Sequence, residues 1–380
     1  MRIALMSSQR DWGGGEQYLW SLGQGLIERG HRVRWVVPPQ SVLRQRIDAA
    51  GYDVFHLSGR KPTPLSLVKL RRQLRADGTQ VLHANDSHAI VWGSLCALAR
   101  TSIHRVGMKH TVFPIRSAAK YNWCLDRLVC VSRAVRELCV ASGIAERRLE
   151  VIPGGIDPPN YDRLSQRGEA CRQLGIDSGV PLLVAVGSLI SCKGFDTLIE
   201  AVSKLRLRIP EFCLVICGEG SMRGELEQLI RVHALQRHVR LIGFQQDPNA
   251  WIAAADVFVH PTRSEGLSLV TIAAQLIGTP VVASEVGGLH EVMRCSETWR
   301  PLGWIYPSQN PAVLTDLIEQ SLCQPAKRRV FVREAYQSAT SRYTLKLMLD
   351  RFESLYRSMI CESAKKQTPQ AASTSRRRAA

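Results

Sequence analysis

The sequence predicts an α/β protein built from two doubly wound parallel sheets, and three observations support this. Short apolar runs of strand character alternate with segments of helical period along most of the chain. No hairpin signal joins neighbouring runs, which favours parallel pairing with helices on both faces of each sheet. The chain has 380 residues. A chain of that length rarely folds around one core, so two domains are expected.

The two halves repeat the same alternation. In the first half, strand-like runs fall at 2–6, 33–37, 81–83 and 128–131, and helical periods at 16–29 and 65–75. In the second half, strand-like runs fall at 182–187, 214–218, 239–243, 257–260 and 281–284. Helical periods there cover 195–205, 222–233, 269–277 and 312–322. Each half therefore predicts a complete sheet with covering helices.

The domain boundary is expected within residues 152–175. This segment holds Pro153-Gly154-Gly155 and Pro158-Pro159, and such clusters interrupt regular structure and suit a hinge. We predict a first domain at 1–165 and a second at 176–342. A helix at about 345–360 follows the second domain, and residues 363–380 have the composition of a disordered basic tail.

Composition excludes several classes of protein and leaves a charge to explain. With 45% hydrophobic and 22% charged residues, the chain is neither fibrous nor wholly disordered. The net charge is +17. Residues 1–178 carry 26 Lys and Arg against 15 Asp and Glu, whereas residues 179–361 carry 19 against 17. The charge belongs mainly to the first half, where it would attract nucleic acid, anionic membrane or anionic substrates.

Cysteine usage and hydropathy indicate a cytoplasmic protein. The eleven cysteines include no Cys-x-x-Cys pair and no zinc-finger spacing. Residues 1–6 look like a first strand rather than a secretory leader, and the longest uncharged apolar stretch, 89–99, is too short to span a bilayer. We therefore expect reduced, mostly buried cysteines.

Three strand-to-helix loops carry candidate chemistry. Gly13-Gly14-Gly15-Glu16 either lets a ligand approach the backbone or simply forms a tight turn. Lys193 lies beside a helix start, where a bound anion would offset the unfavourable dipole, although a solvated lysine is the alternative. Glu265 could accept hydrogen bonds from sugar hydroxyls, or it could only cap a helix.

Taken in order, the motifs resemble a known family. The series is GGGEQ, VSRAV, IPGGID, VGSLISCKGFDTLIEA, GEGSMRGELEQLI, RSEGLSL and GTPVVASEVGGLHEV. It resembles family 4 of the retaining, nucleotide-sugar-dependent glycosyltransferases, from residue 1 to about 360. The resemblance implies the GT-B fold, in which two Rossmann-like domains face each other across a cleft. It also implies a second domain that binds the nucleotide sugar.

The resemblance assigns roles to residues of the second domain. Lys193 matches the lysine of a basic pair that holds the donor diphosphate, but Ser188 stands where the partner arginine is expected. Arginine binds phosphate in a bidentate manner and serine does not; Arg263 or Arg294 is a candidate replacement. Glu265, followed by Gly266 and Leu267, matches the first of two glutamates and contacts the donor sugar. Ala273 replaces the second, which usually holds the ribose.

The remaining implied contacts come from both domains. Gly14, Gly15 and Glu16 match a loop that faces the diphosphate and the acceptor, and His110 matches a histidine near the donor sugar. Gly287, Gly288 and Glu291 match a loop near the nucleotide, with helix initiation as the alternative for Glu291. For His83, Asp86 and His88, the sequence leaves a cleft-facing role and a packing role equally open.

The implied reaction is metal-independent transfer of a sugar, with retention, from a UDP- or GDP-linked donor and without a cofactor. Catalytic roles fall to His110, Lys193 and Glu265. No Asp-x-Asp element occurs and no nucleophilic carboxylate is evident, so front-side transfer is the hypothesis. Domain closure about Pro153–Gly155 would exclude water. A non-catalytic relative is the first alternative, because Ser188 and Ala273 replace expected residues; a sugar-nucleotide epimerase is the second.

The expected acceptor is an anionic glycan or lipid-linked sugar, as in cell-surface polysaccharide or lipopolysaccharide synthesis. Basic residues at 60, 61, 69, 71, 72 and 75 alternate with apolar ones, which suits an anionic membrane surface on the inner face. A solvated helix face is the alternative. No ribbon of basic and aromatic residues supports nucleic acid as a partner.

Overall fold

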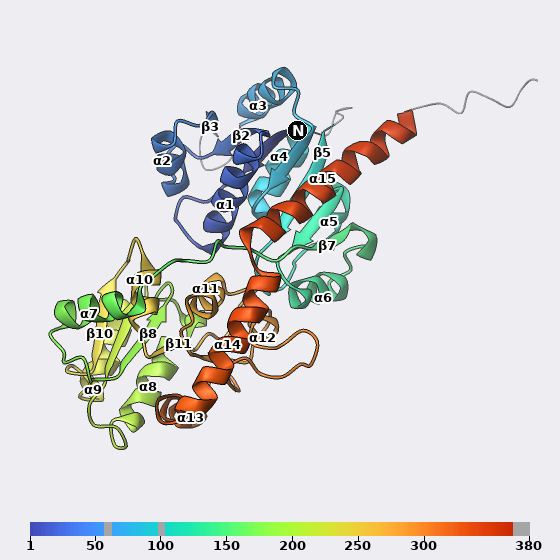
Figure 1. The fold of residues 1–380 in the computed structure, drawn as a ribbon. Coiled ribbons are helices and arrows are strands. Elements are labelled where there is room, and N and C mark those ends of the chain that lie inside the picture. Colours follow the sequence, from blue (N-terminus) through green and yellow to red (C-terminus); the bar gives the residue numbers. More distant parts are fainter. Residues whose placement is uncertain (57–62, 98–102, 368–380) are drawn as a thin grey trace, which may run out of the picture.

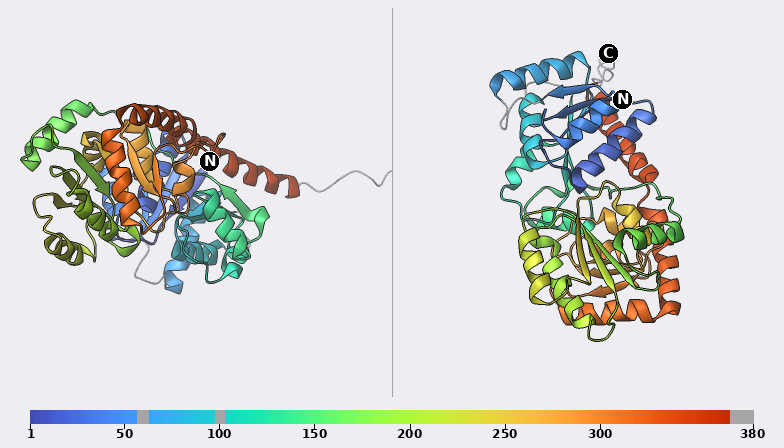
Figure 2. Two further views of the ribbon diagram at one scale, coloured as in Figure 1. Left: turned by 90° about the horizontal axis from the view of Figure 1, so that it is seen from below. Right: turned by 90° about the vertical axis from the view of Figure 1, so that its left-hand side faces the viewer.

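The computed structural model describes residues 1–56, 63–97 and 103–367, with side chains as far as Glu362. Two parallel α/β units follow one another along the chain, and each has its own sheet and core (Figure 1). Helices cover both faces of each sheet, as Figure 2 shows from two further sides. The predicted fold class is confirmed.

The first sheet has seven strands within the described residues, in the order β3-β2-β1-β4-β5-β6-β7. Its strands are β1 (Arg2–Met6), β2 (Arg32–Val37), β3 (Val54–His56), β4 (Val81–Ala84), β5 (His104–Lys109), β6 (Arg127–Cys130) and β7 (Leu149–Val151). Its helices are α1 (Gly14–Glu28), α2 (Val42–Ala49), α3 (Pro64–Ala76), α4 (Ser87–Ala97), α5 (Ala118–Cys124) and α6 (Arg133–Ala141). The strand order reverses between β1 and β4, which is where ligands bind in such sheets.

The second sheet has six described strands in the order β10-β9-β8-β11-β12-β13. These are β8 (Leu182–Val186), β9 (Cys213–Cys217), β10 (Val239–Gly243), β11 (Val257–His260), β12 (Val281–Ser284) and β13 (Trp304–Tyr306). Its helices are α7 (Arg163–Leu174), α8 (Phe195–Leu205), α9 (Arg223–Val232), α10 (Pro248–Ala254), α11 (Leu269–Ile277), α12 (Leu289–Val292), α13 (Pro311–Cys323) and α14 (Pro325–Arg342). The reversal lies between β8 and β11.

Local signals explain where the central elements begin and end. β8 and β9 are buried along their whole length, as expected of inner strands covered on both faces. α11 begins after Ser268, whose hydroxyl accepts from the backbone N–H of Thr271, and it ends at Gly278 with φ 80°. These end points present the loop before α11 to the region between the two units.

Helix α7 lies inside the predicted boundary segment but packs on the second unit. Arg163 donates to the carbonyl oxygens of Ala253, Ala255 and Gly278, and Ala170 belongs to the core around the second sheet. Arg167 pairs with Asp256 at 3.1 Å. Helix α7 was not predicted because its sequence is polar. Its arginines donate hydrogen bonds to backbone carbonyl groups at the ends of neighbouring elements.

Two chain crossings join the units side by side. Ile156 donates its backbone N–H to the Tyr343 carbonyl oxygen (3.0 Å), and Leu345 donates back to the Ile156 oxygen (3.2 Å). A Cβ on Gly155 would overlap the Thr344 carbonyl, so only glycine fits there. The predicted hinge segment therefore lies directly against the second crossing.

The last helix, α15 (Leu345–Gln367), completes the core of the first unit (Figure 1). Phe352 and Tyr356 are fully buried in that core, beside His83. The helix is longer than the predicted 345–360, so the first residues of the predicted tail are helical. Residues 368–380 lie outside the described residues.

Several elements were not predicted from sequence. Strands β3, β5, β7 and β13 are short or carry charged residues, as in His104-Arg105 of β5, so their apolar signal is weak. Helix α14 has almost no apolar stripe and only two buried residues. Within the described part of the chain, no helix combines the length and apolar character needed to cross a membrane.

Candidate active site

A charged cluster lies at the carboxyl end of the second sheet. Lys193, in the loop after β8, places its Nζ 2.6 Å from Glu265 Oε2. His260, the last residue of β11, approaches the same oxygen with its Nε2 at 3.3 Å. Ser268 Oγ lies 3.3 Å from that imidazole nitrogen. The structure thus brings together the two residues that sequence singled out in this half, and adds His260.

Burial and charge set the protonation states of this cluster. Burial would raise the pKa of the Glu265 carboxyl, but the hydrogen bond from His260 and the charge of Lys193 lower it to about 2. Burial lowers the pKa of His260. At neutral pH, Glu265 is therefore an ionised carboxylate between a lysine ammonium and a neutral imidazole.

A second polar group lies at the carboxyl end of the first sheet. His110 Nε2 and Asn85 Oδ1 are 2.8 Å apart, and Asn85 Nδ2 donates to the Gly15 carbonyl oxygen (3.1 Å). Because the amide nitrogen of Asn85 donates to Gly15, its oxygen must accept a hydrogen bond from the N–H at His110 Nε2. Burial lowers the pKa of His110 to about 4. The neutral ring therefore carries its proton on Nε2, which leaves Nδ1 as an acceptor.

Glu16 is buried at the start of α1. Its carboxylate lies 3.5 Å from Ser7 Oγ, which is also 3.5 Å from Asp86 Oδ2. Burial raises the Glu16 pKa to about 7, with a further contribution from the charge of Asp86. The Glu16 carboxylate accepts hydrogen bonds from the backbone N–H groups of Gly13 and of Glu16 itself. A Cβ on Gly14 would meet only open space, so a ligand can approach the backbone at that residue.

The two polar groups meet through glycines. A Cβ on Gly266 would overlap the His110 carbonyl, and one on Gly287 would overlap the Glu265 carbonyl. A Cβ on Gly288 would overlap the Gly266 carbonyl and crowd Ser132 Oγ. Gly266 lets the backbones of the two units touch, and Gly288 lets Ser132 of the first unit approach, whereas Gly287 allows close packing within the second unit. The backbone beside Glu265 therefore lies against the backbone of His110.

Leu267 and Glu291 also bridge the two units. Leu267 packs against the cores on both sides. Glu291 accepts hydrogen bonds from the backbone N–H groups of Ala134 (2.8 Å) and Arg133 (3.2 Å). It therefore covers the start of α6 in the other unit, and neither proposed alternative, a nucleotide contact or initiation of its own helix, anticipated this arrangement.

Both candidates for the missing clamp arginine are paired with acids in the structure. Ser188 is exposed, and Arg263 donates to Asp196 Oδ2 (2.6 Å) and to the Ser191 carbonyl oxygen. Arg294 donates to Glu285 (2.6 Å). Both candidate replacements are thus held by partners within their own unit, and Lys193 is left as the predicted cation beside Glu265.

The open histidine assignments are resolved differently for each residue. His83 is fully buried, and its Nδ1 lies 2.6 Å from Tyr356 Oη, so it packs against α15. Asp86 accepts from the Ser8 backbone N–H and hydroxyl (both 2.6 Å) and from the first turn of α4. His88 is exposed beside Trp92. These three residues do not form one cluster.

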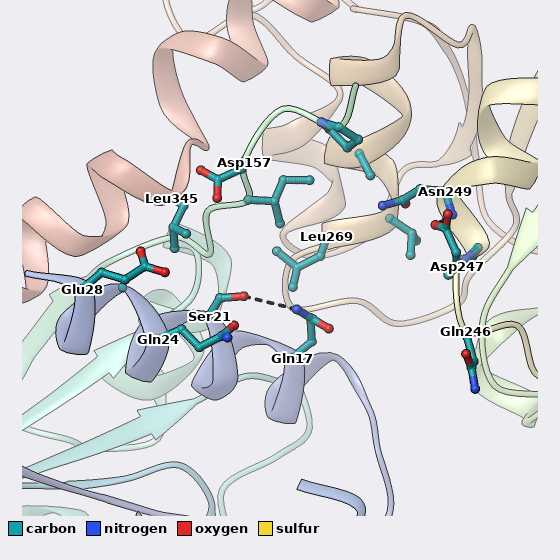
Figure 3. A pocket seen from close by; sticks show the side chains of 16 residues that line it. Gln17, Ser21, Gln24, Glu28, Asp157, Gln246, Asp247, Asn249, Leu269 and Leu345 are labelled. Carbon is teal, nitrogen blue, oxygen red and sulfur yellow. Dashed lines mark hydrogen bonds between the residues drawn. The ribbon is translucent and has the colours of Figure 1, made fainter. Parts of the chain in front are cut away.

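A cavity of about 400 Å³ lies between α1, the first turns of α11 and the loop before α10 (Figure 3). Gln17 and Ser21 of α1 are hydrogen-bonded to each other at 3.2 Å and face Leu269 across the cavity. Ala273, which replaces the expected ribose-binding glutamate, also lines it. The short side chain leaves this part of the wall without a carboxylate.

Sequence reasoning missed His260 and Asn85. His260 ends a buried strand directly before the Glu265 loop, and Asn85 follows β4 in the same way, so position at a strand end was the available signal. Among the residues that the structure describes, no group of three or more His, Cys, Asp or Glu side chains is suited to a metal ion.

Comparison with known proteins identifies the family. A model described as glycosyl transferases group 1 matches residues 166–338, and one described as glycosyltransferase family 4 matches residues 12–159. The structure of Anabaena HepE in complex with UDP has the same fold, with a TM-score of 0.82 over 94% of this chain and 100% of that chain at 19% identity. The chain belongs to the GT-B glycosyltransferases.

Two curated relatives match most of this GT-B glycosyltransferase. An uncharacterized glycosyltransferase of Methanocaldococcus jannaschii is 28% identical over 327 residues, which are 84% of this chain and 79% of the relative. A GDP-mannose-dependent alpha-(1-6)-phosphatidylinositol monomannoside mannosyltransferase of Mycolicibacterium smegmatis is 26% identical over 336 residues, covering 83% and 80%. GT-B glycosyltransferases of this kind use nucleotide-sugar donors, so the expected donor class is confirmed.

Proposed function

We propose that this glycosyltransferase moves a sugar, with retention, from a UDP- or GDP-linked donor to an anionic glycan or lipid-linked acceptor. The observation that carries the proposal is the Lys193–Glu265 ion pair, with Glu265 next to Gly266, whose backbone touches that of His110 in the first unit. The ion pair provides a cation for the departing diphosphate and a carboxylate for sugar hydroxyls, and His110 contributes a neutral imidazole from the first unit.

The geometry supports specific roles. Negative charge develops on the leaving diphosphate, and preorganised donors aimed at that charge usually contribute most to catalysis. Lys193 and the backbone at Gly14, which has open space around it, suit this role. Glu265 accepts hydrogen bonds from the donor sugar, and His110 offers Nδ1 to a hydroxyl. The Glu265 carboxylate is already paired with Lys193, so it is a poor nucleophile, which favours front-side transfer over a covalent intermediate.

The acceptor proposal rests on the first unit. Leu65 and Val68 of α3 are 64% and 47% exposed, and the exposed side chains of Lys69, Arg72 and Arg75 lie on the same helix. Such a surface suits anionic lipid. The M. smegmatis relative is named for a phosphatidylinositol-based acceptor, which supports a lipid-linked, phosphate-bearing acceptor. Basic residues 60 and 61, part of the same prediction, lie outside the described residues.

A membrane-binding assay tests that surface. Vesicles of phosphatidylcholine with about one-third phosphatidylglycerol should sediment with the wild type, and much less with the Lys69→Gln/Arg72→Gln/Arg75→Gln variant. Lys204→Gln, which removes an exposed charge in the second unit, should bind like the wild type. Equal sedimentation of all three proteins would reject the membrane surface.

Calorimetric titration with UDP and GDP, followed by a donor screen with mass-spectrometric product analysis, tests the reaction. We expect one nucleotide to bind and its sugar donor to be consumed. Lys193→Ala and Glu265→Ala should each abolish turnover, while Lys204→Ala should not. Full turnover in both site variants would reject these assignments. Absence of binding by either nucleotide would favour the second candidate, a non-catalytic relative, for which the exposed Ser188 and the buried Ala273 are the supporting observations.

A further inference from the structure

A small cavity in the first unit lies apart from the charged cluster. Its volume is about 280 Å³, and it opens beyond the carboxyl ends of β1, β2 and β4. Every residue that lines it belongs to the first unit: Ser8, Gln9, Arg10, Asp11, Pro38, His88 and Trp92. Neither Lys193 nor Glu265 contributes to it, so it is separate from the residues assigned to the donor.

Hydrogen bonds connect this cavity to His110. Asp86 accepts from Ser8 and from the backbone N–H of His88 (2.9 Å), which fixes both sides of the cavity. The preceding residue, Asn85, holds His110 and Gly15. Asp86 thus links the cavity-lining residues Ser8 and His88 to Asn85, the neighbouring residue that holds His110.

The walls of the cavity have two chemical characters. Trp92 and His88 form an aromatic side, with ring centroids 6.1 Å apart and planes tilted by 37°. The side chains of Gln9, Arg10 and Asp11 are exposed, and none has a polar partner among the described residues. An apolar ring face opposite free hydrogen-bonding groups matches a sugar ring, which has an apolar C–H face and a rim of hydroxyls.

Size and position select one ligand. The volume lies just below the range of about 300–1,000 Å³ typical of pockets for drug-sized ligands, so one sugar ring fits better than an oligosaccharide. We propose that this cavity binds a sugar ring of the acceptor, stacked on Trp92, with its hydroxyls on Gln9, Arg10 and Asp11. The inference rests on the proposed transferase function and names the acceptor subsite within it.

NMR of the tryptophan indoles tests binding directly. The chain has eight tryptophans, and the signal absent from Trp92→Phe identifies Trp92 in ¹⁵N-labelled protein. We expect a panel of methyl glycosides at millimolar concentration to shift the Trp92 signal and UDP or GDP to leave it in place. Two results would overturn the proposal: a Trp92 signal that shifts only when a nucleotide is added, or one that shifts with none of the methyl glycosides. Failure of the proposed transferase function would give a different result from failure of this subsite: neither nucleotide would bind and no donor would be consumed.

Kinetics with the same methyl glycosides provide the second test. Arg10→Ala and Asp11→Ala should each raise the acceptor KM about tenfold while the donor KM stays unchanged, because each removes one polar contact to a hydroxyl. Both residues are exposed, so folding should persist. Trp123→Ala removes an 82% exposed tryptophan of α5 outside the cavity and should change neither constant. Equal acceptor KM values in all variants would overturn the proposal.

Discussion

Glu291 should control the closed arrangement of the two units. Its carboxylate accepts hydrogen bonds from two backbone N–H groups at the start of α6, which belongs to the other unit. A hydrogen bond to a charged group contributes roughly 1.5–3 kcal/mol, and a partly exposed acid falls at the low end. Two such bonds give about 3 kcal/mol, so Glu291→Ala should shift the open–closed equilibrium about 100-fold toward open. Glu291→Gln keeps one neutral acceptor and should shift it about tenfold.

Two native cysteines allow the measurement. Cys323 on α13 and Cys361 on α15 are exposed, and α15 packs on the first unit. Spin labels on this pair, with the partly exposed Cys124, Cys192 and Cys295 replaced by serine, report the distance between units. Glu291→Ala should broaden and lengthen the distribution. Glu285→Gln, which breaks an ion pair with Arg294 within the second unit, is the matched control. Identical distributions for Glu291→Ala and the wild type would refute the reasoning.

Three further predictions concern stability and closure. Glu265 has a folded pKa near 2 against an ordinary 4.5, so its contribution of about 3 kcal/mol is present above pH 4.5 and lost toward pH 2. Urea unfolding should therefore show the stability gap between wild type and Glu265→Gln closing over that range. Glu16 is the opposite case: its folded pKa near 7 makes ionisation unfavourable, so stability is lost as pH rises from about 4.5 through 7. Glu16→Gln should become more stable relative to wild type between pH 5 and 8, and a constant difference would contradict this. Gly266→Ala should widen the spin-label distance while leaving the unfolding midpoint near that of wild type, because its Cβ would overlap the His110 carbonyl of the other unit and a separation of the units relieves that overlap.

The sequence predicted the main elements well where the apolar pattern was strong. The helices at 195–205 and 269–277 have the predicted bounds, because glycine or serine marks their starts and apolar periodicity runs through them. The sequence did not predict several elements whose residues are charged or solvent-exposed. Helix α7 is the clearest case, since its arginines bond to carbonyls of the second unit, which no local pattern reveals.

The candidate site was predicted unevenly for a similar reason. Lys193 and Glu265 lie in loops whose order along the chain is distinctive, and they meet at 2.6 Å. The partner of Glu265, His260, ends a strand that looks like an ordinary core strand, and the partner of His110, Asn85, directly follows another such strand. The sequence also could not tell which acids lie near the two candidate arginines. In the structure, Arg263 pairs with Asp196 and Arg294 pairs with Glu285.

The sequence by itself determined the fold class, the two-part organisation and the concentration of charge in the first half, because periodicity and composition are local properties of the chain. Only the tertiary structure decided that His83 packs in the core, that Glu291 covers a helix in the other unit, and that Gly266, next to Glu265, touches the backbone of His110. These facts depend on contacts between residues up to about 270 positions apart. The physical reason is that burial and hydrogen-bond partners are set by the packed chain, and the same side chain serves structure or chemistry according to what surrounds it.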